Sequence, residues 1–280
     1  MIDTSNGERL ERWGDIILIR PDPQIIWDTK RKHPLWKQAH ARYIRSNTGG
    51  GQWQEYKKVP PMWKISYGDL TFQLKTMGFK HTGIFPEQAV NWDFMADQIR
   101  REVAQGRPVK VLNLFGYTGA ATLACAAAGA QVCHVDASKG MVAWAKENSA
   151  ASGLSDKPIR WLVDDCVKFV QREQRRGNTY DGILMDPPSY GRGPGGEVWK
   201  LEEQLYPLVQ ACLPVLSREP LFFLLNSYTT GLSPSVMEYV LGVLFEKRFS
   251  GQVSSDEIGL PVTVTGKGLP CGSTAMWKKG

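Results

Sequence analysis

The stretch from Val109 to Gly119, V-K-V-L-N-L-F-G-Y-T-G, constrains the fold of this chain more than any other. It begins with a short apolar run between Pro108 and Gly116, which predicts a strand buried on both faces of a parallel sheet. Gly116 and Gly119 then allow a sharp turn and a close approach of the backbone to a ligand, because neither has a Cβ atom. The Ala-rich run 120–129 follows at once and predicts a helix.

A second strand and an acidic residue complete this nucleotide-binding pattern. Residues 131–135, Q-V-C-H-V, predict the strand, and Asp136 follows at about the separation of 20 residues at which a carboxylate meets a ribose in such folds. The turn G-Y-T-G lacks the dinucleotide fingerprint G-x-G-x-x-G. We therefore expect a nucleoside ligand without phosphates, and S-adenosyl-L-methionine (SAM) fits that description. The alternative is a turn with a purely structural role.

Strands and helices alternate through the rest of the chain. This alternation predicts a parallel sheet covered on both sides, with ligands at the carboxyl ends of its strands. We predict an α/β fold with a Rossmann-like, seven-stranded sheet and helices on both faces. The expected strands are 109–115, 131–135, 159–163, 180–185, 221–225, 259–264 and 273–278, and the expected helices are 89–103, 120–129, 138–152, 167–176, 200–216 and 235–247.

A small β-rich domain is expected before this sheet. Strands are predicted at 16–20 and 24–27, and 63–77 predicts a hairpin that turns at Gly68-Asp69. The joint is expected at 78–83, so the predicted domains are 1–82 and 83–280.

Residues 30–58 combine basic side chains with aromatic rings. A surface for single-stranded nucleic acid needs both, because the charges follow the phosphates and the rings stack on bases. The net charge of +6 and pI near 9.0 favour a polyanionic partner such as RNA. The alternative is a solvated helix with a few aromatic rings anchored to a small core. The rings are Trp36, Tyr43, Trp53 and Tyr56.

The remaining composition argues against several classes of protein. The 5 cysteines form no C-x-x-C pair and the 4 histidines show no metal-ligand spacing, so we expect reduced thiols and no metal. The N-terminus lacks the apolar core of a signal peptide, and no apolar run is long enough to span a membrane. A cytoplasmic location is expected, and the oligomeric state stays open.

The segment Asp186-Pro187-Pro188-Ser189-Tyr190 follows the predicted strand 180–185 and points to a specific chemistry. An exocyclic or amide NH2 is a poor nucleophile, because its lone pair is delocalised. The Asp186 carboxylate and the Pro187 carbonyl can accept its hydrogens, Pro187 and Pro188 hold that geometry, and Tyr190 can stack on a flipped-out base. The reaction would be an in-line displacement at a sulfonium methyl, in which alignment supplies most of the rate. The alternative is a rigid turn.

These motifs together resemble class I SAM-dependent methyltransferases. N-L-F-G-Y-T-G, Asp136, V-D-D-C, D-P-P-S-Y and G-I-F-P-E-Q carry the resemblance, which covers roughly residues 83–277. Within the class, the chain is most similar to the bacterial large-subunit ribosomal RNA (cytosine-C5) methyltransferase-like family, without its PUA domain. The cofactor-binding residues that the resemblance implies are Phe85, Gln88, Asn113, Phe115, Gly116, Tyr117, Thr118, Gly119, Asp136, Ala137, Ser138, Asp165, Cys166 and Asp186.

The resemblance also assigns roles within this set. Asp136 would bind the ribose hydroxyls and Asp165 the adenine amino group, with Asp164 as the alternative one position away. Trp199 and Lys200, after the glycine-rich lid candidate Gly191–Gly196, would contact the substrate. The tentative substrate contacts after the fifth strand are Asn226 and Tyr228.

The chain departs from the family at two further points, and the second changes the expected chemistry. Ala89 follows Gln88 where the family usually has arginine. Methylation of cytosine C5 requires a thiolate to attack the base, yet neither D-P-P-S-Y nor N-S-Y contains cysteine, which leaves only Cys271 as a candidate. We therefore expect methylation of nitrogen.

The resulting hypothesis is a SAM-dependent methyltransferase that N-methylates a base in structured, ribosomal RNA and releases S-adenosyl-L-homocysteine. The alternatives are methylation of a protein amide or a small molecule, methylation of cytosine C5 in RNA, and a SAM-binding RNA-interaction protein without catalysis.

Overall fold

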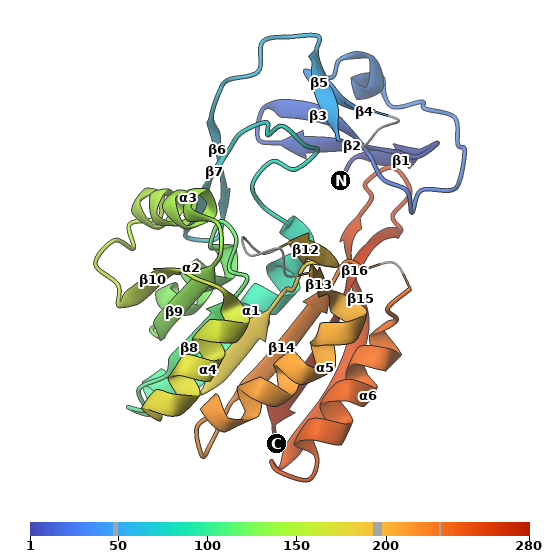
Figure 1. The fold of residues 1–280 in the computed structure, drawn as a ribbon. Helices are drawn as coiled ribbons and strands as arrows, with labels where there is room; N and C mark the ends of the chain where they lie inside the picture. The colour runs from blue at the N-terminus through green and yellow to red at the C-terminus, as the bar shows by residue number, and fades with distance from the viewer. Residues whose placement is uncertain (47–49, 193–197, 230) are drawn as a thin grey trace. The chain divides into compact units, whose positions relative to one another are not determined.

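The computed structural model describes residues 1–46, 50–192, 198–229 and 231–280 (Figure 1). The chain forms two compact units: Met1–Glu87 with Gly259–Cys271, and Gln88–Ile258 with Gly272–Gly280. The sequence places the whole C-terminal hairpin in the second domain, whereas its tip belongs to the N-terminal unit. The tip does so because Val262, Leu269 and Cys271 form an apolar cluster with Ile25. The roles assigned to the domains 1–82 and 83–280 stay predictions.

The C-terminal unit is built on the predicted seven-stranded sheet, in the order β10-β9-β8-β11-β14-β16-β15. The first five strands in this order pair in parallel, and β16 pairs antiparallel to β14. The elements of this unit are α1 (Ala89–Ala104), β8 (Lys110–Leu114), α2 (Ala120–Ala127), β9 (Gln131–Asp136), α3 (Lys139–Ala151), β10 (Ile159–Val163), α4 (Cys166–Arg176), β11 (Gly182–Met185), β12 (Tyr190–Arg192), β13 (Val198–Lys200), α5 (Leu201–Cys212), η3 (Leu213–Val215), β14 (Phe222–Ser227), α6 (Pro234–Phe245), β15 (Gly251–Pro261) and β16 (Gly268–Lys279).

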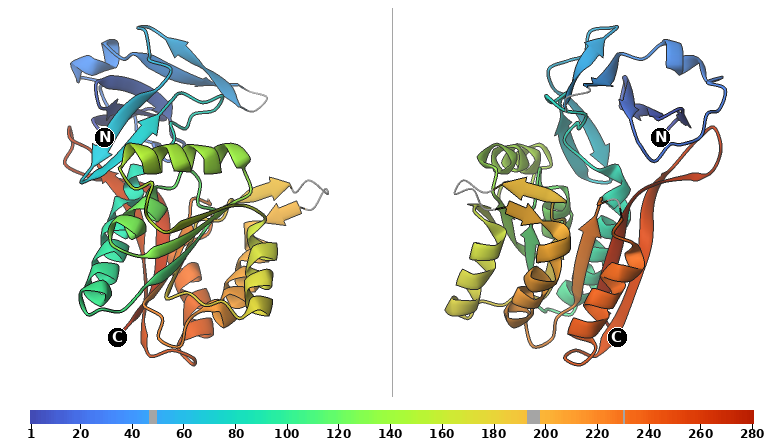
Figure 2. Two further views of the ribbon diagram at one scale, coloured as in Figure 1. Left: turned by 90° about the vertical axis from the view of Figure 1, so that its left-hand side faces the viewer. Right: turned by 45° about the vertical axis from the view of Figure 1, so that its right-hand side comes forward.

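Helices cover both faces of this sheet, with α4, α5 and α6 on one face and α1, α2 and α3 on the other (Figures 1 and 2). Leu112, Met185 and Leu225 point into the core formed with α4, α5 and α6. Successive side chains of a strand alternate between faces, so Asn113 and Asn226 lie on the α1 side of the sheet.

The predicted order of strands and helices in this unit is confirmed, with two differences. Strand β15 spans Gly251–Pro261, so it begins before the predicted strand 259–264 and residues 262–264 lie outside it, while β16 extends beyond the predicted 273–278 at both ends. The helix expected from residue 200 begins at Leu201, because β12 and β13 form an unpredicted hairpin in which Tyr190 pairs with Lys200. Strands of three residues carry no alternation that a sequence can reveal.

The N-terminal unit contains a five-stranded sheet and a separate hairpin. The hairpin turns at Gly68-Asp69, as predicted. The predicted strand 24–27 is wrong: Ile25 lies in a turn after β3, where its N–H donates to Asp22 O. Strands β1 and β2 were not predicted from the sequence. Their segments, D-T-S and E-R-L-E-R-W, are mostly polar or charged and lack a clear alternation with apolar residues. The elements are β1 (Asp3–Ser5), β2 (Glu8–Trp13), β3 (Ile16–Pro21), η1 (Pro34–Lys37), β4 (Ala41–Arg45), β5 (Gly51–Glu55), β6 (Trp63–Tyr67) and β7 (Leu70–Leu74), and η2 (Pro86–Gln88) stands at the boundary between the units.

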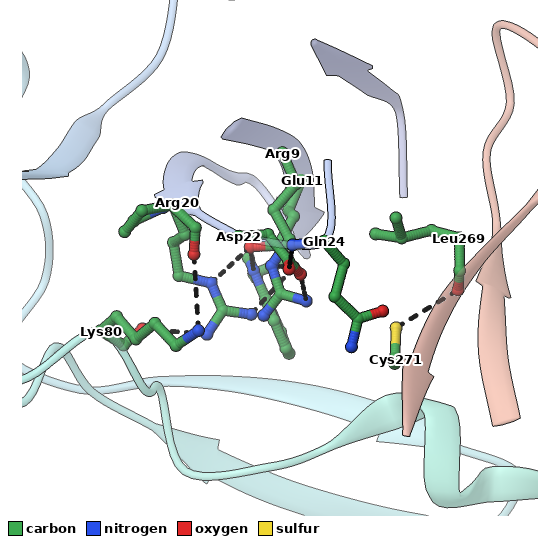
Figure 3. Close-up of polar contacts among 10 residues, drawn as sticks. Arg9, Glu11, Arg20, Asp22, Gln24, Lys80, Leu269 and Cys271 are labelled. Carbon is green, nitrogen blue, oxygen red and sulfur yellow. Dashed lines mark hydrogen bonds and ion pairs between the residues drawn. The ribbon is translucent and has the colours of Figure 1, made fainter. Parts of the chain in front are cut away.

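One face of this sheet is ionic although it is buried (Figure 3). Glu11 is 3% exposed and accepts hydrogen bonds from Arg20 Nε at 2.5 Å and Arg20 Nη2 at 2.8 Å. Arg9 Nε lies 3.3 Å from Glu11 Oε1 and Arg9 Nη1 lies 3.4 Å from Asp22 Oδ2. Burial by itself would raise the pKa of Glu11, but Arg20 and Arg9 outweigh it and lower that pKa to about 2.

The aromatic rings of residues 30–58 correct the predicted stacking surface. Trp36 and Tyr43 are 9% and 3% exposed, and the Trp53 ring packs edge-on against Tyr43. Trp36 belongs to the small core, as the alternative interpretation expected, but the helix of that interpretation is wrong, because residues 41–45 and 51–55 form β4 and β5. Tyr56 is 51% exposed, next to the exposed Lys57 and Lys58. Among the described helices, none is long and apolar enough to cross a membrane.

Candidate active site at the carboxyl ends of the central strands

The loop after β8 has an unusual backbone. Phe115 and Tyr117 have φ values of 57° and 49°, and Gly119 has 88°. Non-glycine residues rarely adopt this region, and they persist only where the surroundings hold them. The hydrogen bonds that hold this loop run from Phe115 N to Cys166 Sγ, from Gly116 N to Val135 O, from Tyr117 N to Asp136 Oδ2 and from Gly119 N to Gly116 O.

These bonds also indicate the kind of ligand that the loop suits. A phosphate-binding loop directs its N–H groups at the ligand. In this loop four N–H groups already donate hydrogen bonds to protein acceptors, namely those of Phe115, Gly116, Tyr117 and Gly119. The loop therefore fits a nucleoside without phosphates, as the sequence predicted.

The two glycines of the loop are required by neighbouring side chains. A Cβ atom on Gly116 would lie 2.4 Å from His134 Cε1, and one on Gly119 would lie 2.9 Å from Ala145 Cβ. From the sequence, both glycines were expected to allow the approach of a ligand. The structure gives a different reason, which is the packing of the loop on β9 and α3.

His134 supports the loop from below as a neutral ring. Its side chain is fully buried, and burial lowers its pKa to about 3. Thr122 Oγ1 accepts a hydrogen bond from Asn113 Nδ2 at 2.8 Å and lies 2.9 Å from His134 Nδ1. The Thr122 hydroxyl can donate to Nδ1 or accept from it, and the tautomer of the ring sets which of the two it does. Asn113, a predicted cofactor residue, is itself buried in this chain of bonds.

Asp136 stands at the end of β9, where the sequence predicts a ribose-binding carboxylate. Its Oδ2 accepts from Tyr117 N at 2.9 Å and its Oδ1 from Ser138 N at 2.8 Å. Burial raises its pKa, and these two amides oppose that shift. A carboxylate offers about four lone pairs, so two remain for a pair of ribose hydroxyls. The free acceptor positions of Asp136 thus fit the ribose of SAM. The next two residues, Ala137 and Ser138, are exposed.

The two candidate adenine ligands have different partners. Asp164 forms an ion pair with Arg172. Asp165 caps α4 through Oδ1, which accepts from Lys168 N at 2.8 Å, and its side chain is exposed. The structure therefore favours Asp165, and its role stays a prediction. Cys166, the next residue, is buried and its Sγ faces the cofactor loop.

The D-P-P-S-Y segment leaves β11 beside this loop and is held by hydrogen bonds to its backbone and to Ser189. Trp199 Nε1 donates to Pro188 O at 2.6 Å, and Leu201 N donates to Ser189 O at 3.1 Å. Ser189 Oγ also lies 2.6 Å from Thr229 Oγ1, in the loop after β14. Tyr190, at the start of β12, is 52% exposed, which suits a ring that stacks on a substrate.

The β12–β13 hairpin places Trp199 between the two loops. Its ring centroid lies 5.8 Å from that of Phe115 while its N–H holds Pro188. Lys200 is exposed and its Nζ lies 2.7 Å from Glu203 Oε1. Residues 193–196 of the predicted lid lie outside the described residues.

A buried network of polar side chains connects the start of α1 with the ends of β14 and β16. Gln88 Nε2 donates to Tyr228 OH at 2.9 Å, and Gln88 Oε1 accepts from Asn91 Nδ2 at 2.8 Å. Asn91 Nδ2 also reaches Asn226 Oδ1 and Thr274 Oγ1. Gln88, Asn226 and Tyr228 were predicted as site residues. Asn91 and Thr274 were missed, and the only signal for them is a polar residue at a position that alternation or helical period assigns to the interior.

Phe85 and Cys271 belong to the N-terminal unit. The Phe85 ring lies 5.2 Å from His81, and its assignment to the cofactor stays a prediction. Cys271 donates through Sγ to Leu269 O at 3.4 Å, and burial raises the pKa of its thiol to about 12 (Figure 3). No group of three or more potential metal ligands occurs in the described ranges of the chain.

The sheet order, the strained nucleoside loop, the carboxylate after β9 and the D-P-P-S-Y segment after β11 define a class I methyltransferase. The chain belongs to the family of S-adenosylmethionine-dependent methyltransferases, which matches residues 34–210. When bound, SAM supplies an electrophilic methyl group.

Solved structures show the same fold. The SAM-dependent methyltransferase of Agrobacterium tumefaciens is 38% identical with a TM-score of 0.93, over 100% of this chain and 90% of that one. The methyltransferase SMU.776, solved with SAH, is 19% identical with a TM-score of 0.76, over 98% of this chain and 72% of that one. The second likeness shows the fold alone.

Similarity to a ribosomal RNA methyltransferase extends over a smaller part of the chain. Over 121 residues the chain is 36% identical to ribosomal RNA large subunit methyltransferase K/L of Shewanella baltica. This region is 42% of the chain and only 16% of that relative.

Proposed function

We propose that this methyltransferase N-methylates an NH2 group on a base of ribosomal RNA. The observation that carries the proposal is the arrangement of carbonyl groups in D-P-P-S-Y. The Pro188 carbonyl is occupied by Trp199 and the Ser189 carbonyl by Leu201. The Pro187 carbonyl has no hydrogen-bond partner among the described residues.

This arrangement supports a division of roles at the target amine. The Asp186 carboxylate accepts one hydrogen of the NH2 group and the Pro187 carbonyl accepts the other, which turns the nitrogen lone pair toward the methyl group. Pro188 fixes the backbone between these acceptors and the stacking ring of Tyr190. Alignment then supplies most of the rate, and no strong base is needed.

The state of the cysteines argues against the C5 alternative. That chemistry needs a thiolate beside the base. All five cysteines are buried, and burial raises the pKa of each thiol, to about 11 for Cys133 and about 12 for Cys125 and Cys271. At neutral pH such thiols stay protonated.

Two observations support RNA as the substrate. The relative from Shewanella baltica is named as a ribosomal RNA methyltransferase, and the N-terminal unit exposes Tyr56 with Lys57 and Lys58. A protein amide presents the same NH2 group, so the competing substrate class is part of the test.

The test is transfer of labelled methyl from SAM to total RNA and total protein from cells that lack the gene, followed by digestion. We expect label in an N-methylated nucleoside, abolished by Asp186→Ala and retained by the exposed control Asp156→Asn. RNA binding should weaken steeply with salt. Label in 5-methylcytosine or only in protein would refute the proposal, and RNA binding without any transfer would favour the non-catalytic alternative.

A further inference from the structure

Asn226 lies just beyond the point where the neighbouring strands β11 and β14 stop pairing. The β11–β14 ladder ends at Met185 opposite Leu225, so Asp186 and Asn226 are the next residues on the two strands. Met185 and Leu225 both point into the core under α4, α5 and α6. Alternation within β14 therefore directs Asn226 to the α1 side of the sheet, and Asp186 is the first residue after β11 on the neighbouring strand.

The hydrogen bonds of Asn226 decide which way its amide faces. Its Oδ1 accepts from Thr274 Oγ1 at 2.6 Å and from Asn91 Nδ2 at 3.0 Å. The Nδ2 group therefore points away from this pair of donors. Within the described part of the chain, Asn226 Nδ2 has no hydrogen-bond partner, although the residue is only 4% exposed.

An amide donor in this position indicates a ligand. A donor that no protein acceptor satisfies at a largely buried residue is paired by water or by a ligand that replaces the water. The Asn226 Nδ2 atom is not fully buried, and part of it is accessible to solvent. It can therefore donate to a molecule placed at the ends of β11 and β14.

The network behind Asn226 holds this donor in place. Asn91 also donates to Gln88 Oε1 at 2.8 Å and to Thr274 Oγ1 at 2.9 Å. Elements α1, β14 and β16 are thereby connected through side chains that are all buried. Asn226 on β14 is fixed by partners on α1 and β16, so its Nδ2 group keeps one direction. A group that recognises a substrate needs such a fixed direction.

We propose that Asn226 determines specificity by donating a hydrogen bond to an acceptor atom next to the methylated amine. The inference rests on the proposed function. Asp186 accepts from the NH2 group and Asn226 Nδ2 donates to its neighbour, so the substrate presents a donor beside an acceptor. Cytosine N4 beside N3 and adenine N6 beside N1 have this pattern on the edge that a flipped base offers. The guanine amine lies between the N1–H donor and the acceptor N3, so guanine offers the same pattern through N3.

The test uses the ribosomal RNA of cells that lack the gene, with Asn226→Ala, Asn226→Asp and Thr274→Val. Asn226→Ala and Asn226→Asp should each lower kcat/KM for the RNA by about tenfold or more, because both remove the donor. The dissociation constant of SAM should change less than about twofold. Thr274→Val, which keeps the donor, should lose less than Asn226→Ala.

A substrate analogue separates recognition from structure. In RNA whose acceptor nitrogen beside the methylated amine is replaced by carbon, the wild type and Asn226→Ala should react at equal rates. Unchanged kcat/KM in Asn226→Ala, or an equal loss in Thr274→Val, would overturn the inference. Either result would leave the proposed N-methylation intact, whereas label only in protein or in 5-methylcytosine would refute the proposed function itself, so the two failures are distinguishable.

Discussion

Gly116 and His134 show how single residues shape the cofactor loop. The loop turns directly over a buried imidazole, which a Cβ atom at position 116 would strike at 2.4 Å. The imidazole is itself bonded through Thr122 to Asn113 on β8. The conformation of the loop therefore depends on buried side chains of β8, α2 and β9 that lie outside the loop.

Gly116→Ala should destabilise the protein by about 1–3 kcal/mol, because the new methyl group overpacks the contact with His134. We also expect the dissociation constant of SAM to rise at least about tenfold as the loop shifts. The matched control is Gly140→Ala in the first turn of α3, where a Cβ atom would meet only Ser138 Oγ at 3.8 Å. That change should be neutral or slightly stabilising. Calorimetric titration and urea unfolding measure both effects, and equal behaviour of the two variants would contradict the prediction.

Acid should weaken the fold through His134. Its folded pKa is about 3 against an ordinary value of 6.5, so below pH 6.5 the unfolded chain binds the proton more readily than the native state does. This contribution is therefore fully present above pH 6.5 and is lost as the pH falls. Between pH 7 and 5 the wild type should lose about 2 kcal/mol more than His134→Gln. Urea unfolding at both pH values measures this, and parallel losses in the two proteins would refute it.

At the scale of elements, the short β12–β13 hairpin connects the two halves of the site. Its Trp199 contacts Phe115 of the cofactor loop with the ring and holds Pro188 of the D-P-P-S-Y segment with the indole N–H. Because the hairpin leads directly into α5 at Leu201, the start of that helix is positioned with it.

Trp199→Phe keeps an aromatic ring beside Phe115 and removes the bond to Pro188 O. We expect kcat to fall about three- to tenfold, since one hydrogen bond that aligns the acceptors is worth about 1 kcal/mol. SAM affinity should stay the same. Trp53→Phe is the matched control, because Trp53 Nε1 likewise donates to a backbone carbonyl, Met77 O at 2.9 Å, in the N-terminal unit. Steady-state kinetics with labelled SAM would contradict the prediction if both variants lost kcat equally.

At the scale of the whole molecule, the two units are stabilised in different ways. The sheet of the C-terminal unit is buried between helices by apolar side chains. The sheet of the N-terminal unit has an apolar face around Leu10 and Trp36 and an opposite face of buried ions around Glu11. A buried charge is tolerated only with its partner, so the second face depends on complete pairing.

Glu11→Gln should lower the free energy of unfolding of the full chain by about 3–5 kcal/mol, because it leaves Arg20 and Arg9 buried without their shared carboxylate. The control is Asp97→Asn, which breaks the exposed pair between Asp97 and Arg101 on α1 and should cost less than about 1 kcal/mol. Chemical unfolding followed by tryptophan fluorescence compares the two. Similar small losses would show that the ionic face does not stabilise the unit.

Much of the C-terminal unit could be predicted from local patterns. The apolar run before Gly116 and the strand that ends at Asp136 are encoded by neighbouring residues, and both lie where the sequence placed them. Short strands could not be predicted in this way. The hairpin of β12 and β13 exists only through pairing across a loop, and β2 has charged residues on a face that burial would normally make apolar.

Local patterns in the chain were enough to predict the order of the strands and helices, the fold class and the positions of the D-P-P-S-Y segment and Asp136 at strand ends, because periodicity and turn residues act over a few neighbours. Only the tertiary structure decided that His134 requires Gly116, that Trp36 and Tyr43 belong to a core, and that Asn91 and Thr274 orient Asn226. These contacts join residues far apart in the chain, and the buried bonds between them form only when the elements pack together.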